Sequence, residues 1–360
     1  MTSSPPPAHR RGYLDWLRGV GVLIMIEGHS LDSWARVEDR GRDGYQMAIL
    51  IAGIGAPLFL FLAGVALALA AASRMRKGLS RAQVLRLALS RGAWIFALAF
   101  LFRLQSWVIS GGAFPGSLLK VDILNVMGLA MMAGALLWAA GGSARSRAAV
   151  CIAATAAIAM ATPLVRAAAG LTVLPDPIEW YLRPAPGSAT FTLFPWSAFL
   201  TAGIAVGLWL DTMRTPAHEA RGVAAITGLG LLVAAAGYGA SFLPPLYANA
   251  SFWTTSPTFF FVRLGLVLAS MGVAFVAIRG WGSAPLQEFG RASLFVYWIH
   301  VEMAYGVLSL PLHRRLPFEM ALASLVLFSL ILFALVRLKD RLQWRPGRAG
   351  RWTPAPTNVS

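Results

Sequence analysis

The segment LRGVGVLIMIEGHSLDSW (17–34) has the length of a membrane-crossing helix but carries four ionisable side chains, Arg18, Glu27, His29 and Asp32. On a helix, Arg18 and His29 share one face and lie about 16 Å apart along the axis, because eleven residues are close to three turns. Asp32 lies near that face, and Glu27 points away from it. Ionisable groups inside a membrane span usually mark a site or a pathway. The first span therefore predicts a polar stripe from the inner surface to beyond the midplane.

The two groups on this stripe suggest a specific chemistry. An imidazole such as that of His29 exchanges a proton near neutral pH, so it can activate an amine or hydroxyl, or carry an acyl group for one step. A guanidinium such as that of Arg18 binds phosphate through paired hydrogen bonds. The pair therefore suits an anionic donor that enters from the cytoplasm. The alternative is structural: Arg18 snorkels to the surface and His29 bonds to a neighbouring helix.

Two later spans carry further polar candidates. In RAQVLRLALSRGAWIFALAF (81–100), Arg86 and Arg91 lie near the inner end, and Arg91 lies about two turns into the span. Both are predicted to bind the donor, with a structural ion pair as the alternative for Arg91. In RASLFVYWIHVEMAYG (291–306), His300 reaches a depth similar to that of His29, and Tyr297 lies on its side of the helix. A site role and a helix–helix hydrogen bond are equally open for His300.

Asp122 and Asn125 in KVDILNVMGLA (120–130) share a face near the outer surface. They are candidates for binding the acceptor together with Asp32, Tyr297 and His300. A capping or packing role is an equal alternative for Asp122 and Asn125.

The composition indicates which elements position these residues. Hydrophobic residues make up 57% and charged residues 13% of the 360 residues, about half the charge of a typical soluble domain. Apolar runs of about 20 residues predict an all-α, polytopic membrane bundle. Gly203 and Gly207 are predicted to let two helices approach closely. About ten spans are expected, at 17–34, 45–72, 84–108, 118–140, 147–166, 189–211, 222–243, 257–279, 291–311 and 318–338.

The net charge of +16 does not indicate nucleic acid, because the excess of arginine falls on alternate inter-span segments. This pattern follows the positive-inside rule and predicts that both termini are cytoplasmic, with some anchoring to anionic lipids. The Pro-rich or basic ends, 1–12 and 341–360, are predicted to be disordered, and 13–340 to form the membrane domain. Motifs for metal or nucleotide binding are not found.

YLDWLRGVGVLIMIEGHS (13–30) resembles the opening of membrane acyltransferases, in which an arginine and a histidine are separated by ten residues. The ordered segments GAPLFLFLAGVALAL, LALSRGAWIFAL, VDILNVMGLA, FPWSAFLTAGIAVG and SLFVYWIHVEMAYG resemble bacterial relatives of the heparan-alpha-glucosaminide N-acetyltransferase catalytic domain. The likeness covers about residues 10–340, although the relatives of the lysosomal enzyme tend to have glutamine and arginine before the glycine of DILNVMGLA.

This resemblance implies transfer of an acetyl or other short acyl group, without a metal, from cytosolic acyl-CoA to an acceptor across the membrane. His29 would be catalytic, and Arg18, Arg86 and Arg91 would bind the CoA phosphates. The acceptor would be an extracytoplasmic glycan or small molecule with an amine or hydroxyl. The location would be the bacterial inner membrane, and the sequence leaves open whether the protein is a homo-oligomer.

The main alternative is a proton-coupled transporter in which His29, His300 and Glu27 form a proton path. Transporters usually contain internal repeats, and none is evident here. A purely structural or lipid-binding protein would leave the stripe of Arg18 and His29 unexplained.

Overall fold

A computed structural model describes residues 11–110, 114–248, 250–280 and 283–343. The predictions for the two ends of the chain lie mostly outside these ranges. The long helices are α1 (Gly12–Trp34), α3 (Gly55–Arg76), α4 (Arg81–Ser110), α6 (Ile123–Ala140), α7 (Ala144–Ala167), α9 (Leu193–Asp211), α10 (Pro216–Ala240), α11 (Pro257–Ala277), α13 (Ser293–Tyr305) and α14 (Phe318–Gln343). Shorter helices are α2 (Asp43–Ala52), α5 (Gly116–Leu119), α8 (Asp176–Glu179) and α12 (Ser283–Arg291), with 3-10 turns at Val37–Gly41, Ala169–Val173 and Val307–Ser309.

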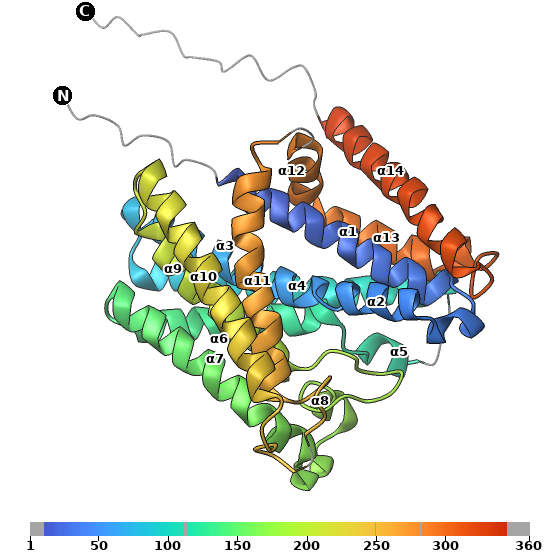
Figure 1. Ribbon diagram of the computed structural model, residues 1–360, viewed down its shortest axis with the longest axis horizontal. Coiled ribbons are helices and arrows are strands. Elements are labelled where there is room, and N and C mark those ends of the chain that lie inside the picture. Colours follow the sequence, from blue (N-terminus) through green and yellow to red (C-terminus); the bar gives the residue numbers. More distant parts are fainter. Residues whose placement is uncertain (1–10, 111–113, 249, 281–282, 344–360) are drawn as a thin grey trace, which may run out of the picture.

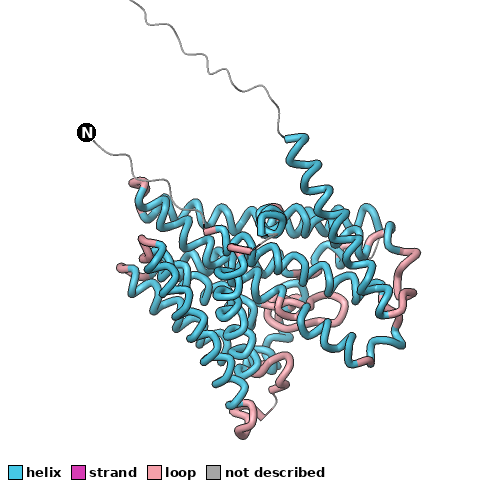
Figure 2. Tube along the Cα trace, turned by 45° about the horizontal axis from the view of Figure 1, so that its top comes forward, coloured by secondary structure: helices cyan, strands magenta, loops and turns pink. Residues whose placement is uncertain are grey.

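The chain is an all-α polytopic membrane bundle, as predicted. Helices form most of the described chain (Figure 2), and β-structure there is limited to isolated bridges such as Val121 to Ala189. Eight helical segments among the described residues are long and apolar enough to cross a membrane. The other two predicted spans correspond to α1, which carries several charges, and to α13, which is only 13 residues long. Ten crossings therefore remain a prediction.

Helix α1 lies inside the bundle rather than at its edge. It contacts α2, α3, α11, α12, α13 and α14, and Figure 1 shows it running between these elements. Several of its apolar residues, among them Val22 and Ile26, are fully buried against neighbouring helices. The helix is therefore surrounded by protein over much of its length, whereas Asp32 near its C-terminal end is exposed.

Glycines bring two helix pairs unusually close together. A Cβ at Gly203 would lie 2.0 Å from the carbonyl oxygen of Phe61, and one at Gly64 would lie 2.0 Å from that of Leu200. The predicted close approach at Gly203 is thus confirmed, and it joins α9 to α3. The second pair is α1 and α12, where a Cβ at Gly290 would lie 1.9 Å from the Asp15 carbonyl oxygen. This second approach holds the N-terminal part of α1 close to the C-terminal end of α12.

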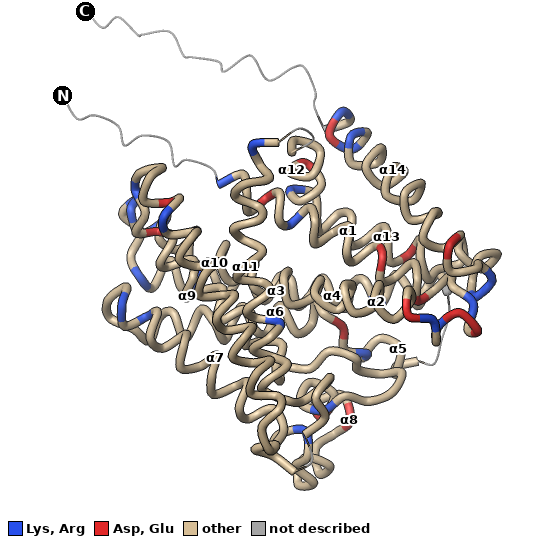
Figure 3. The backbone as a smooth tube through the Cα atoms, viewed as in Figure 1, with Lys and Arg blue, Asp and Glu red and all other residues tan. Residues whose placement is uncertain are grey.

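Many charged residues gather at the helix ends, and a smaller number lie within the bundle (Figure 3). On one side, Arg76 binds both carboxylate oxygens of Asp211 at 2.6 and 2.8 Å, which joins the ends of α3 and α9. On the opposite side, Asp39 accepts the Phe318 N–H at 2.9 Å and so caps α14. That bond, together with Arg36, holds the pKa of Asp39 below its ordinary value.

Candidate functional site: a cavity with arginines at one end and carboxylates at the other

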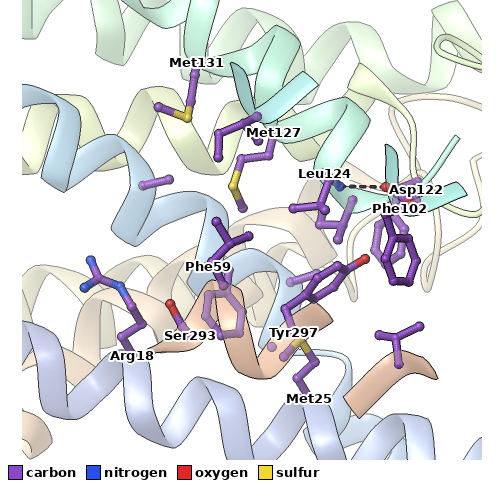
Figure 4. Close-up of a pocket in the computed structure, with 18 of the residues that line it drawn as sticks. Arg18, Met25, Phe59, Phe102, Asp122, Leu124, Met127, Met131, Ser293 and Tyr297 are labelled. Carbon is purple, nitrogen blue, oxygen red and sulfur yellow. Dashed lines mark hydrogen bonds between the residues drawn. The ribbon is translucent and has the colours of Figure 1, made fainter. Parts of the chain in front are cut away.

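A cavity of about 1030 Å³ runs between α1, α3, α4, α6 and α13. Its middle is lined by large apolar and aromatic side chains, including Met25, Phe59, Met127 and Tyr297, which point into the space from different helices (Figure 4). Helix α3 presents Ala63, Ala66 and Ala70 to it, at the spacing of one helical face. The middle of the cavity is therefore mainly apolar.

Four arginines from four helices line one end of the cavity: Arg18 of α1, Arg74 of α3, Arg91 of α4 and Arg291 of α12. Arg18 is paired with Asp15, at 3.1 Å. For Arg74, Arg91 and Arg291, no carboxylate of the described residues lies within ion-pair distance. Four guanidiniums from separate helices that line one cavity, three of them with no described carboxylate within ion-pair distance, form a site for a ligand with several negative charges.

Two carboxylates line the other end. Asp122 forms an ion pair with Arg103, Nε to Oδ2 at 3.3 Å, and Glu302 of α13 also lines the cavity. The Oε1 atom of Glu302 is buried, and among the described residues it has no hydrogen-bond partner. A buried oxygen of this kind is costly unless a ligand or water donates to it. This end therefore suits a ligand that donates hydrogen bonds.

The loop between α7 and α9 covers this second end. Thr190 and Phe191 line the cavity, and the Val121 N–H donates to the Ser188 carbonyl at 2.8 Å. Beside this contact, Tyr181 is half-buried, and burial raises the pKa of its phenol above the ordinary value. The loop thus forms part of the wall at the carboxylate end.

Two histidines meet in the middle of the bundle. His29 lines the cavity, while His300 lies behind it and has no exposed surface. The Nδ1 of His29 is 2.8 Å from the Nε2 of His300, and the Nδ1 of His300 is 2.8 Å from the carbonyl oxygen of Val296. Tyr305 places its ring edge against His29, 5.6 Å between centroids, and donates its hydroxyl hydrogen to Asp32 at 2.9 Å. Contacts from α13 therefore hold His29 in place.

The structure places the predicted site residues in three settings. Arg18, His29, Arg91, Asp122 and Tyr297 line the cavity. Arg86 is exposed and does not line it. This follows from helix geometry, because Arg86 and Arg91 are five residues apart and so point about 140° away from each other.

The remaining three predicted residues lie beside the cavity. Asn125 is fully buried and completes a capping box, its Oδ1 accepting the Asp122 N–H at 3.0 Å. Asp32 lies at the surface, where it bonds to Tyr305 and forms an ion pair with Arg40 at 3.6 Å. His300 does not line the cavity but contacts two residues that do, His29 and Tyr297. These three residues support cavity-lining groups or their helices rather than lining the cavity themselves.

Sequence reasoning missed several cavity residues. Arg74 and Arg291 were assigned to topology alone, and Arg103, Glu302 and Tyr305 were not selected. Arg103 and Glu302 did carry a signal, because each is an ionisable group within a predicted span. His300 and Glu302 are two residues apart on one helix and so point in nearly opposite directions, and it is Glu302 that lines the cavity. Among the described residues, no group of three or more His, Cys, Asp or Glu side chains could hold a metal ion.

The bundle and its cavity define a multi-pass membrane protein with an internal, chemically asymmetric site. The chain belongs to the family of the heparan-alpha-glucosaminide N-acetyltransferase catalytic domain, whose model matches residues 10–237. The resemblance noted in the sequence is thereby confirmed, and the chain is a membrane acetyltransferase. The matched range contains Arg18, His29, Arg91 and Asp122, whereas His300 and Glu302 lie outside it. No curated protein matches the chain.

Proposed function

We propose that the protein transfers an acetyl or other short acyl group from cytosolic acyl-CoA to an acceptor on the opposite side of the membrane. One observation carries this proposal. A single cavity has four arginines at one end, carboxylates at the other, and His29 between them. Both termini would be cytoplasmic, and the membrane would be the bacterial inner membrane. The cavity would let donor and acceptor approach from opposite sides.

The arginine end fits the donor. CoA carries several phosphate charges on a nucleotide and a long, thin arm that ends in the thioester. Arg18, Arg74, Arg91 and Arg291 would hold the phosphates, and the arm would follow the small side chains of α3. From Arg18 to His29 the axial distance is about 16 Å, so an extended arm would bring the thioester toward the imidazole.

His29 would supply the proton transfers. In the direct route, the imidazole removes a proton from the acceptor as the acceptor attacks the thioester carbonyl, and it then returns that proton to the departing CoA thiolate. In the two-step route, the imidazole is acylated first and then passes the group on. Ping-pong kinetics would support the second route. The apolar walls would restrict water and so limit hydrolysis of the thioester.

The carboxylate end fits the acceptor. Glu302 and Asp122 would accept hydrogen bonds from amine or hydroxyl groups, and the unpartnered Glu302 oxygen favours a group with donors to spare, such as the amine of an amino sugar. The transporter alternative has less support, because Glu27 does not line the cavity that His29 lines.

Sealed vesicles test the proposed sidedness. Vesicles of both orientations, inside-out and right-side-out, are loaded with a panel of amino sugars and neutral sugars. Labelled acetyl-CoA is then added to the external solution. We expect acceptor labelling only in inside-out vesicles, because these expose the arginine end. Inside-out vesicles with His29→Ala serve as the blank. Labelling that does not depend on vesicle orientation, or equal labelling with the blank, would contradict the proposal.

Donor binding is expected to depend on Arg91 and not on Arg86. Removing one charge-assisted contact costs about 1.5–3 kcal/mol, so Arg91→Gln should raise the KM for acetyl-CoA about 10- to 100-fold, with a smaller effect on kcat. Arg86→Gln is the matched control on the same helix and should leave the KM unchanged. Equal KM values for the two variants would remove Arg91 from the donor site. The difference should also shrink at high salt.

A further inference from the structure

We infer that His300 is a positioning residue that fixes the tautomer of His29, so that Nε2 of His29 is the atom that exchanges protons with the substrates. The inference rests on the proposed function for its catalytic consequence. The tautomer assignment itself depends only on the contacts of the two rings.

The hydrogen bond between the rings has good geometry. Their planes differ by 6° and their centroids are 5.0 Å apart. The centroid separation equals the 2.8 Å between the nitrogens plus about two ring radii, which is the largest separation that this contact allows. The two imidazoles therefore lie edge to edge in nearly one plane rather than face to face. An N–H of one ring therefore points at the in-plane lone pair of the other.

The direction of this bond follows from the next contact in the chain. A carbonyl oxygen can only accept, so the 2.8 Å contact with Val296 requires the proton of a neutral His300 to be on Nδ1. The Nε2 of His300 then carries a lone pair and must accept from His29. His29 in turn carries its proton on Nδ1 and has a lone pair on Nε2.

The alternative directions are unfavourable. A neutral His300 that donated from Nε2 would place the Nδ1 lone pair against the Val296 oxygen, leaving two acceptors facing each other. A doubly protonated His300 would be a fully buried cation, and no described carboxylate lies within ion-pair distance of it. The chain from Val296 through His300 to His29 therefore has one satisfied arrangement.

This arrangement has a consequence for the reaction. Among the described residues, Nε2 of His29 has no hydrogen-bond partner, and His29 lines the cavity. As the acceptor attacks the thioester, Nε2 takes its proton, and the resulting imidazolium keeps its Nδ1–H bond to His300. The same Nε2–H then protonates the CoA thiolate, which restores the neutral ring. In the two-step route, Nε2 would be the acylated atom.

Nitrogen NMR of the protein labelled with ¹⁵N-histidine tests the tautomer directly, because protonated and unprotonated ring nitrogens of a neutral imidazole have distinct shifts. The chain has five histidines, and the His29 signals are assigned by their loss in His29→Ala. We expect the proton on Nδ1 in the wild type and a different proton distribution in His300→Leu, which lacks the acceptor. A wild-type His29 with its proton on Nε2 would overturn the inference, and this result needs only the wild-type fold.

Kinetics test the positioning role. His300→Leu should lower kcat roughly 100-fold, the lower range for lost acid–base catalysis, with the KM for acetyl-CoA unchanged. His300→Gln should recover part of the loss, because its amide oxygen can accept from His29. His313→Gln, outside the cavity lining, is the control. An unchanged kcat in His300→Leu would refute the role. An Nδ1–H tautomer in a protein without transferase activity would support the tautomer assignment and refute the proposed function instead.

Discussion

Replacement of His29 by alanine is expected to lower the rate of acyl transfer by about 10²- to 10⁴-fold, which is the range for loss of a general acid–base group. Both the proton-transfer chemistry of the His29 imidazole and its position in the middle of the cavity account for this expectation. Among the described residues, His29 and Tyr297 bring ionisable groups to the middle of the cavity, and a buried phenol is a poor base. Without the imidazole, the acceptor would have to lose its proton to solvent, which the apolar walls restrict.

The His29→Ala measurement separates catalysis from binding and folding. Steady-state kinetics should show a loss in kcat with a nearly constant KM for acetyl-CoA, since the arginine end is unchanged. His313→Ala is the matched histidine control and should retain activity, because His313 does not line the cavity. Added imidazole should restore part of the His29→Ala rate, because the cavity is large enough to admit it. Wild-type turnover by His29→Ala would show that the reaction does not pass through this residue.

Replacement of Gly203 by alanine is expected to destabilise the bundle by about 1–3 kcal/mol or more, the usual cost of overpacking. The new methyl group would lie 2.0 Å from the Phe61 carbonyl oxygen. This neighbour is backbone, so it cannot move aside as the end of a flexible side chain could. Helices α3 and α9 would have to separate, and α3 would shift its cavity-lining face as it moved.

Gly228→Ala is the matched control for Gly203→Ala. Gly228 lies within helix α10, and a Cβ there would meet nothing within 4 Å. The same substitution should therefore be neutral or stabilise the helix by up to about 1 kcal/mol. Unfolding in detergent micelles gives both free energies under one condition. Equal stabilities of the two variants would show that the close approach of α3 and α9 does not depend on Gly203.

The sequence predicted one part of the site well, for a physical reason. Arg18 and His29 belong to the same helix, so the helical repeat alone determines that they share a face and how far apart they lie. Both line the cavity. Arg86 was grouped with Arg91 because both lie at the inner end of one span. Depth alone does not decide which way a side chain points, and the two point about 140° apart.

What the sequence alone determined is the membrane class, the helices and the spacing of groups within each helix. Apolar length and helical geometry determine these locally. Only the tertiary structure decided which groups from different helices come together: His29 bonds to His300, and Arg18 shares one cavity with Arg74, Arg91 and Arg291. These meetings depend on which helix faces pack together, and that depends on small residues such as Gly19, whose Cβ would lie 2.0 Å from the Leu286 carbonyl oxygen. Contacts of this kind join residues far apart in the chain, so no local pattern encodes them.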